Sequence, residues 1–248
     1  MQNSSGKKAV KIFGCGGCGC ASLVVGFVGL IIYFTAFSNF CARMMGEETY
    51  PLSGDPARFE PFASVSDIRS KIGVGAKLKS IEARYVRSDG TMDLNARYKP
   101  APNVTYEFVM PLDKEPENAP PIGAGRSPGD VWLQTVTVNV YEPGQRRHVQ
   151  RISGASRSSY SYTNEGMDVD RGTPSMGSIK ESLEDPKVSA KEMWDIALKK
   201  GADKDAVATL SYEEDGYRFT IAGSRVFLEW DRDGKFSEDR SHYPGQER

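Results

Sequence analysis

The residues of this chain whose type and spacing could do chemistry begin with cysteines near its start. Cys15, Cys18 and Cys20 form a C-x2-C-x-C run, a thiol spacing that can hold zinc. The run has no nearby histidine and no second cluster, and Cys41 stands apart from it. Small residues at a membrane entry explain the run better than a metal site, and acylation of these cysteines is an alternative. We therefore expect no metal and no cofactor.

Carboxylates supply the second candidate chemistry. A hydrolase would use Asp168 and Asp170, because general acid–base catalysis needs carboxyl groups brought together by the fold. The two histidines, His148 and His242, are far apart in the chain and have no ligand partner at useful spacing. The Asp-x-Asp-Gly run at 231–234 lacks the closing glutamate of a calcium loop and favours a hairpin turn. We expect no catalytic site residues and a protein that is not an enzyme, with a hydrolase as the alternative.

A third group of residues suggests contact with a partner. Arg157, Tyr160, Tyr162 and Arg171 place guanidinium and aromatic groups in one stretch, a composition that is enriched at protein interfaces. The competing interpretation is a solvated loop whose tyrosines lie on the sheet. These four residues are the predicted contact site.

An apolar segment at residues 21–40 predicts where the protein lies. Twenty uncharged residues in a helix cover the hydrocarbon core of a bilayer, about 30 Å thick. Lys7, Lys8 and Lys11 precede the segment and only Arg43 follows closely, so the N-terminus is expected in the cytoplasm and the remainder outside. A cleaved secretory signal is the alternative, and it exports the same domain.

Charge and cysteine content limit the function classes of the part after the apolar segment. The chain carries a net charge of −1, and residues 1–43 hold four basic and no acidic residues, so the remainder carries −5. This mild acidity argues against nucleic acid as a partner. All four cysteines precede residue 42, so no disulfide framework supports the domain. The expected partners are the membrane, through residues 21–40, and an extracytoplasmic protein or peptide.

The elements that would position these residues are predicted twice along the chain. A helix begins after Ser64 and another after Ser189, where Glu192 completes a capping box. Each helix is followed by a strand that runs into an Asp-Gly pair, at 89–90 and 215–216, and such pairs between alternating runs predict hairpins. The returning strands are expected at 91–97 and 217–222, with third strands following them.

The predicted fold is α+β, with one N-terminal transmembrane helix followed by two repeated α-β-β-β modules. An additional hairpin, from 131–141 to 148–152, is expected to extend the sheet of the first module. The expected organisation is a cytoplasmic segment (1–20), a transmembrane helix (21–40), a linker (41–61), a first module with the extra hairpin (62–155), a flexible loop (156–187), a second module (188–237) and a tail (238–248).

The second module carries a family resemblance. Residues 189–200, 215–221 and 226–235 provide a helix with an A-L-containing core, a D-G-Y strand and a last strand that ends in a D-x-D-G-K turn. Residues 189–236 thereby resemble the PepSY module, and the rest of the chain resembles a bacterial membrane-anchored protein. The resemblance implies a non-catalytic extracytoplasmic module that binds at the outer face of a membrane or restrains a peptidase. We expect a membrane-anchored binding or interaction module, with a hydrolase, a peptidase-restraining module and a structural spacer as alternatives.

Overall fold

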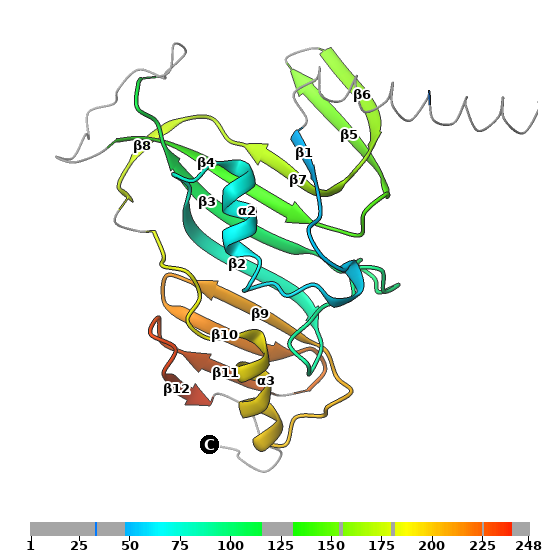
Figure 1. The fold of residues 1–248 in the computed structure, drawn as a ribbon, viewed down its shortest axis with the longest axis vertical. Coiled ribbons are helices and arrows are strands. Elements are labelled where there is room, and N and C mark those ends of the chain that lie inside the picture. The colour runs from blue at the N-terminus through cyan, green and yellow to red at the C-terminus, as the bar shows by residue number, and fades with distance from the viewer. Residues whose placement is uncertain are drawn as a thin grey trace, which may run out of the picture.

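One large antiparallel sheet dominates the computed structural model, which describes residues 33, 48–115, 131–153, 156–179, 182–224 and 226–239 (Figure 1). The strand order is β1-β7-β4-β3-β2-β9-β10-β11-β12, and β8 pairs with β4 beside β7. The strands of this ten-stranded sheet are β1 (Glu48–Pro51), β2 (Lys77–Val86), β3 (Val104–Pro111), β4 (Val131–Val140), β7 (Gly166–Arg171), β8 (Ser175–Gly177), β9 (Ala208–Glu213), β10 (Gly216–Ile221), β11 (Phe227–Trp230) and β12 (Phe236–Asp239).

A separate two-stranded sheet projects from one end of the molecule (Figure 1). It consists of β5 (Arg146–Ser153) and β6 (Ser156–Thr163), which pair from Arg146 opposite Thr163 to Ser153 opposite Ser156. The segment 156–187, expected to be a flexible loop, therefore contains β6, β7 and β8. We refer to the β5–β6 pair as the ribbon.

Two α-helices pack on the same face of the large sheet (Figure 1). They are α2 (Val65–Ile72), preceded by the short 3-10 helix η1 (Pro56–Arg58), and α3 (Ala190–Lys199). The capping box predicted for α3 is confirmed, since the Ser189 hydroxyl accepts from the Glu192 N–H at 3.2 Å and the Glu192 carboxylate accepts from the Ser189 N–H at 2.8 Å. At α2 the Ser64 side chain instead donates to the Glu60 carbonyl and makes no cap.

The core lies between these helices and the sheet and is continuous from one end to the other. Alternate residues of each strand point into it, as the period of two along a strand requires. Its largest fully buried side chains come from both halves of the sheet: Tyr106, Phe108, Trp194, Tyr212, Tyr217, Phe219 and Trp230.

The expected α+β fold with two repeated α-β-β-β modules is wrong, because the described chain is mainly antiparallel β-sheet and the strands that directly follow the two helices, β2 and β9, belong to one sheet. The strands β2 and β9 join the halves, with Ile81 opposite Tyr212 and Ala83 opposite Leu210. A module with one buried face gains hydrophobic burial when its sheet continues into a neighbour. Pairing of β2 with β9 achieves this.

The expected transmembrane anchor is also corrected. No helix among the described residues is long and apolar enough to cross a membrane, and this finding overturns the single-pass anchor and the extracytoplasmic location inferred from it. Residues 21–40, which carried the expectation, lie outside the described residues except for Tyr33. The cysteine run at 15–20 and Cys41 lie outside them as well.

The chain after Asp89-Gly90 does not form the strand expected at 91–97. Both edges of β2 are occupied, by β3 and β9, so the sheet has no place for a returning strand. The returning chain makes a single bridge to β2, Met92 opposite Val86, and then pairs with the segment before α2, where the Met92 and Phe59 backbones exchange hydrogen bonds of 2.8 and 3.0 Å. The turn itself packs on the start of α3, since a Cβ on Gly90 would lie 2.6 Å from the Lys191 nitrogen.

An ion-pair network holds β1 at the edge of the sheet. Arg171 donates to both carboxylate oxygens of Glu48, at 2.6 and 2.9 Å, and to the Ile72 carbonyl at the end of α2 at 3.2 Å. The hydrogen bond from Arg171 lowers the pKa of Glu48, against the opposing effect of burial. The pKa of Tyr50 is raised, chiefly because its hydroxyl donates a hydrogen bond to Glu48.

Candidate binding surface

The face of the sheet opposite the helices is not covered by any described element. Its central positions carry hydroxyl, amide and charged side chains, which alternate with the buried residues along each strand. Across four adjacent strands these include Asn139, Thr137, Thr105, Glu107, Glu82, Arg84, Thr209 and Ser211. We call this surface the open face.

A bulge in β2 marks one end of the open face. The register with β9 shifts between Arg84 and Val86, and the additional residue is Tyr85, whose φ is +68°. It is the only non-glycine residue with positive φ among those described. The left-handed conformation costs an L-residue about 1–2 kcal/mol, and a bulky aromatic side chain is rarely found there. A bulge re-aims the side chain that it carries.

Tyr85 is paired with a second tyrosine. Its ring stacks on that of Tyr98, with centroids 4.5 Å apart and ring planes 14° from parallel. The Tyr98 side chain is 42% exposed, one of the few large apolar residues at the surface of the described chain. The segment that carries Tyr98 is tied to the end of β4 by Arg97, which donates to Glu142 at 2.6 and 3.2 Å. Stacking and tethering hold the two rings in place.

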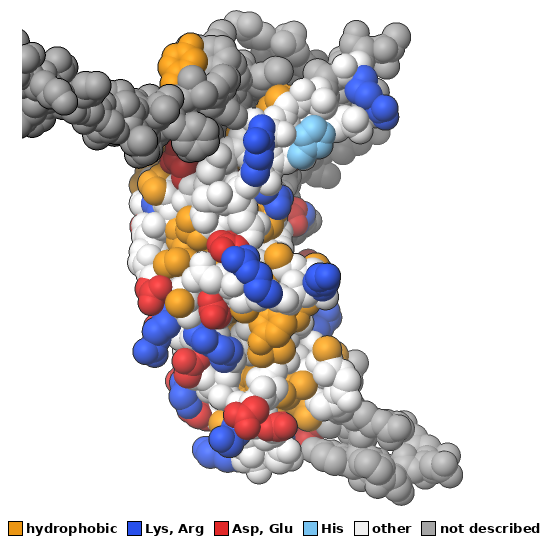
Figure 2. All heavy atoms as spheres, turned by 90° about the vertical axis from the view of Figure 1, so that its right-hand side faces the viewer, with side chains coloured by type: hydrophobic (Ala, Val, Ile, Leu, Met, Phe, Trp, Pro, Cys, Tyr) orange, Lys and Arg blue, Asp and Glu red, His pale blue; other side chains and the backbone are white. Residues whose placement is uncertain are grey.

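Hydrogen-bonding side chains adjoin this tyrosine pair. The Asn103 carbonyl accepts from the Arg84 N–H at 3.3 Å, and the Asn103 amide donates to the Thr105 hydroxyl at 3.4 Å. That hydroxyl donates in turn to the Asn139 side chain at 3.0 Å. In Figure 2, which shows the right-hand side of Figure 1, hydrophobic side chains lie among basic and acidic ones in the middle of the surface. An apolar centre with a polar rim is the usual composition of a protein-binding surface.

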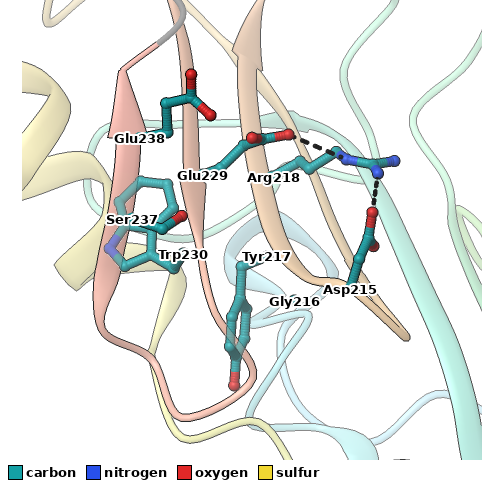
Figure 3. A pocket seen from close by; sticks show the side chains of 8 residues that line it. All are labelled: Asp215, Gly216, Tyr217, Arg218, Glu229, Trp230, Ser237 and Glu238. Carbon is teal, nitrogen blue, oxygen red and sulfur yellow. Dashed lines mark hydrogen bonds and ion pairs between the residues drawn. The ribbon is translucent and has the colours of Figure 1, made fainter.

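A polar pocket of about 370 Å³ lies at the other end of the open face, around Arg218 (Figure 3). The guanidinium lies 3.5 Å from a carboxylate oxygen of Glu229 and 3.5 Å from one of Glu213, and it also bonds to Asp215. Tyr217 and Trp230 are also among the lining residues, and both are buried. Ser237 and Glu238 complete the lining. Because Arg218 holds three carboxylates in ion pairs, the pocket is suited to polar contact.

The carboxylates expected for a hydrolase lie on β7. Asp168 and Asp170 are two residues apart and share the open face, opposite Asn139 and Thr137. Asp168 lies 3.5 Å from the Arg147 guanidinium, which stacks 4.0 Å above the Tyr141 ring, whereas Asp170 is exposed. Burial raises the pKa of Tyr141, and the Arg147 charge opposes this shift. Asp168 therefore serves to link the ribbon to the sheet.

The predicted contact residues are not brought together as one patch. Arg157, Tyr160 and Tyr162 lie on β6 of the ribbon, and Tyr162 is buried. Arg171 lies on β7 and faces the helix side of the large sheet, where Glu48 engages it. The predicted contact site thus stays a prediction, and its members belong to two sheets.

Metal ligands do not converge in the part of the chain that the structure describes, where no three His, Cys, Asp or Glu side chains are placed to hold an ion. His148 lies on β5, and its ring nitrogen is 3.0 Å from the Ser161 hydroxyl. His242 lies outside the described residues.

Sequence reasoning missed the Tyr85–Tyr98 pair. The sequence patterns favoured titratable groups and the tyrosines of β6 as site residues. A tyrosine near the end of a strand has the residue type expected of any strand position. The break in alternation at Arg84-Tyr85-Val86 is the only local signal of the bulge, and it identifies neither the positive φ nor the stacking partner.

Comparison of the chain with protein-family models, with curated proteins and with solved structures found no match in any of the three. The PepSY resemblance of residues 189–236 stays a prediction.

Proposed function

We propose that this protein is a non-catalytic binding module that holds a protein or peptide partner against Tyr85, Tyr98 and the adjoining open face. The observation that carries the proposal is the left-handed backbone of Tyr85 at a bulge in a central strand. Strained residues persist where the surrounding structure over-determines them, and they cluster at ligand-contacting sites.

The chemistry of the surface supports a protein partner. Tyrosine supplies a large apolar contact area with a polar tip and little side-chain entropy to lose, because it has two rotatable bonds. Asn103, Thr105 and Asn139 beside the pair offer donors and acceptors that a partner's backbone can use. The rigid sheet beneath them reduces the entropy lost on binding.

The competing hydrolase has weaker support. Its carboxylates would be Asp168 and Asp170, and Asp168 faces an arginine rather than a second carboxyl group in a cleft. In the Arg218 pocket the carboxylates of Glu213, Asp215 and Glu229 are likewise held in ion pairs with the arginine. These arrangements favour binding over acid–base chemistry.

A photo-crosslinking residue at position 98 of the full chain, produced in its own host, tests the proposal. We expect a discrete crosslinked partner at position 98 that is missing when the same residue replaces Val74, which is 88% exposed on another surface. The same adducts at both positions, or none at position 98, would contradict the proposal.

A second measurement separates a contact role from a structural one. Tyr98→Ala should abolish the crosslink from a photo-residue placed at Asn103 and leave the thermal midpoint nearly unchanged. Tyr85→Gly relieves the left-handed strain while it removes the stack, so the free energy of unfolding should change by less than about 1 kcal/mol. A loss of several kcal/mol would show that Tyr85 is structural.

A further inference from the structure

The ribbon concentrates positive charge in a chain that is acidic elsewhere. Residues 146–163 contain four arginines and one histidine and no aspartate or glutamate. Since the whole chain carries −1, the remainder of the chain carries −5. The net charge of the chain is close to zero, but the ribbon is a separate basic element.

The two faces of the ribbon differ. The register places Arg146, His148 and Gln150 of β5 on the same face as Thr163, Ser161 and Ser159 of β6. Arg146, His148, Gln150 and Ser159 on this face are exposed, and Arg157 near the tip is exposed as well. In Figure 2, basic side chains gather beside a histidine over the upper, projecting part of the molecule.

The other face of the ribbon is more apolar and more buried. Val149 and Tyr160 are half-buried neighbours across the two strands, and Tyr162, opposite Arg147, is 3% exposed. Arg147 is engaged with Asp168 and Tyr141, which fixes the ribbon to the large sheet. Arg146 has no ion-pair partner among the described residues.

The outer edge of β5 is open to another strand. Within the described chain β5 pairs only with β6, so its outer row of backbone N–H and C=O groups has no strand partner. An edge of this kind is a template for an added strand from another chain. β5 is also the more basic strand of the two, with Arg146, Arg147, His148 and Arg151.

We propose that the outer edge of β5 binds an extended acidic segment of a partner protein as an added strand. In such a strand alternate side chains share one face. Carboxylates at alternate positions would lie beside Arg146 and His148, and apolar residues between them would lie on the face of Val149. This site is separate from the Tyr85–Tyr98 surface and does not depend on the function proposed for it.

Other anions fit the ribbon less well. Arg146 and Arg157 stand at positions six residues apart along the paired strands, about 20 Å at the rise of a β-strand, so they do not converge on a small anion. Nucleic-acid sites commonly neutralise about 6–10 phosphates, and the exposed face offers few cations. The acidic remainder of the chain would also repel a long polyanion.

Fluorescence anisotropy with labelled peptides and the full-length protein tests the proposal. The probe is a seven-residue peptide in which glutamate alternates with valine. The comparison peptide has the same charge but a central proline, which cannot complete the strand pairing. We expect the alternating peptide to bind at least about tenfold more tightly than the proline peptide, and binding to weaken as the salt concentration rises.

Arg146→Glu should weaken binding of the alternating peptide by at least about tenfold. Lys204→Glu makes the same charge change at an exposed residue in the loop before β9, far from the ribbon, and should leave binding unchanged. Tyr98→Ala should also leave it unchanged, which separates failure of this proposal from failure of the proposed function.

Three outcomes would overturn the inference. Equal binding of both peptides would mean attraction by charge alone. Tighter binding of a DNA duplex or of vesicles with anionic lipid would assign the ribbon to another class of partner. No peptide binding, together with self-association of Arg146→Gln, would mean that the arginines only guard the edge against aggregation.

Discussion

The half of the sheet that follows α2 and the half that follows α3 begin with similar local sequence and end differently. Each starts with a serine before a helix, continues into a strand and reaches an Asp-Gly pair. After α3 the chain forms a hairpin in which Glu214 and Asp215 turn and Gly216 opens β10. After α2 the returning chain makes only one bridge to β2, between Met92 and Val86, and then packs on the segment around Phe59.

The difference shows that a turn signal specifies a reversal but not the partner of the returning chain. Gly90 and Gly216 both have positive φ, at +82° and +121°. β9 has an edge available for β10, whereas the corresponding edge of β2 is taken by β9 itself. The place of a strand in the sheet therefore decides whether its hairpin closes.

The largest expected effect tests whether the two halves share one core. Trp194→Ala removes a fully buried side chain that packs edge-on against Phe219 at 5.0 Å and should lower the free energy of unfolding by about 3–5 kcal/mol. Ile68→Ala in the other half should cost about 2–5 kcal/mol. Both variants should unfold in one transition in denaturant. Two separated transitions in calorimetry would show that the halves are independent.

The glycines of the two Asp-Gly turns should lose different amounts of stability when each is replaced by alanine. Gly216→Ala places a Cβ 2.1 Å from the Trp230 carbonyl oxygen in a left-handed conformation and should cost about 3 kcal/mol. Gly90→Ala meets the Lys191 backbone at 2.6 Å and should cost about 2 kcal/mol. The control is Gly144→Ala, which has φ +82° and open space, with an expected loss of about 1 kcal/mol. If urea titrations give the same loss of unfolding free energy for all three variants, the positive φ alone sets the cost of the substitution.

The outer edges of the two halves should respond differently to loss of their ion pairs. Arg171→Met leaves the half-buried Glu48 without its partner and should cost about 1–2 kcal/mol. Lys200→Met, which breaks the 3.0 Å pair with Asp239 at the end of β12, should cost about 0.5 kcal/mol. Thermal midpoints at neutral pH measure both.

The pH dependence gives the sign of the Arg171 contribution. The folded pKa of Glu48 is lowered, so its stabilisation is complete above the unfolded pKa of about 4.3 and is lost as the pH falls through the lower folded value. In Arg171→Met the loss of stability that Glu48 causes at low pH should disappear. If the difference in the free energy of unfolding between wild type and variant stays the same from pH 7 down to pH 2, the assigned role of Arg171 is wrong.

The smallest expected contrast is between the two helix caps. Ser189→Ala removes the capping box of α3 and should cost about 1 kcal/mol. Ser64→Ala removes one exposed hydrogen bond to the Glu60 carbonyl and should cost about 0.5 kcal/mol or less. Helix-specific hydrogen exchange should rise at the start of α3 in the first variant and change little at α2 in the second.

Local features of the second half could be predicted from sequence, and long-range ones could not. The Ser189–Glu192 box, the β9–β10 hairpin and the turn at 231–234 are confirmed, because each is made by residues close in the chain. The strands of the segment 156–187 were not predicted. β6 lies next to its partner β5 in the chain, but its serine-rich sequence has no consistent apolar alternation to indicate a strand. The partners of β7, which are β1 and β4, are not its neighbours in the chain. The binding surface was missed because Tyr85 and Tyr98 meet only through the path of the loop between them.

Sequence alone determined the helix at 190–199, the alternation that buries one face of each strand, and the absence of cysteines after residue 41. The tertiary structure decided that β2 and β9 join into one sheet, that Arg171 forms an ion pair with Glu48, and that the arginines of 146–157 lie on a projecting ribbon. Helix caps and alternation act between neighbours in the chain. The β2–β9 pairing and the Glu48–Arg171 ion pair join residues more than a hundred positions apart, and their partners are selected by the burial of the whole core.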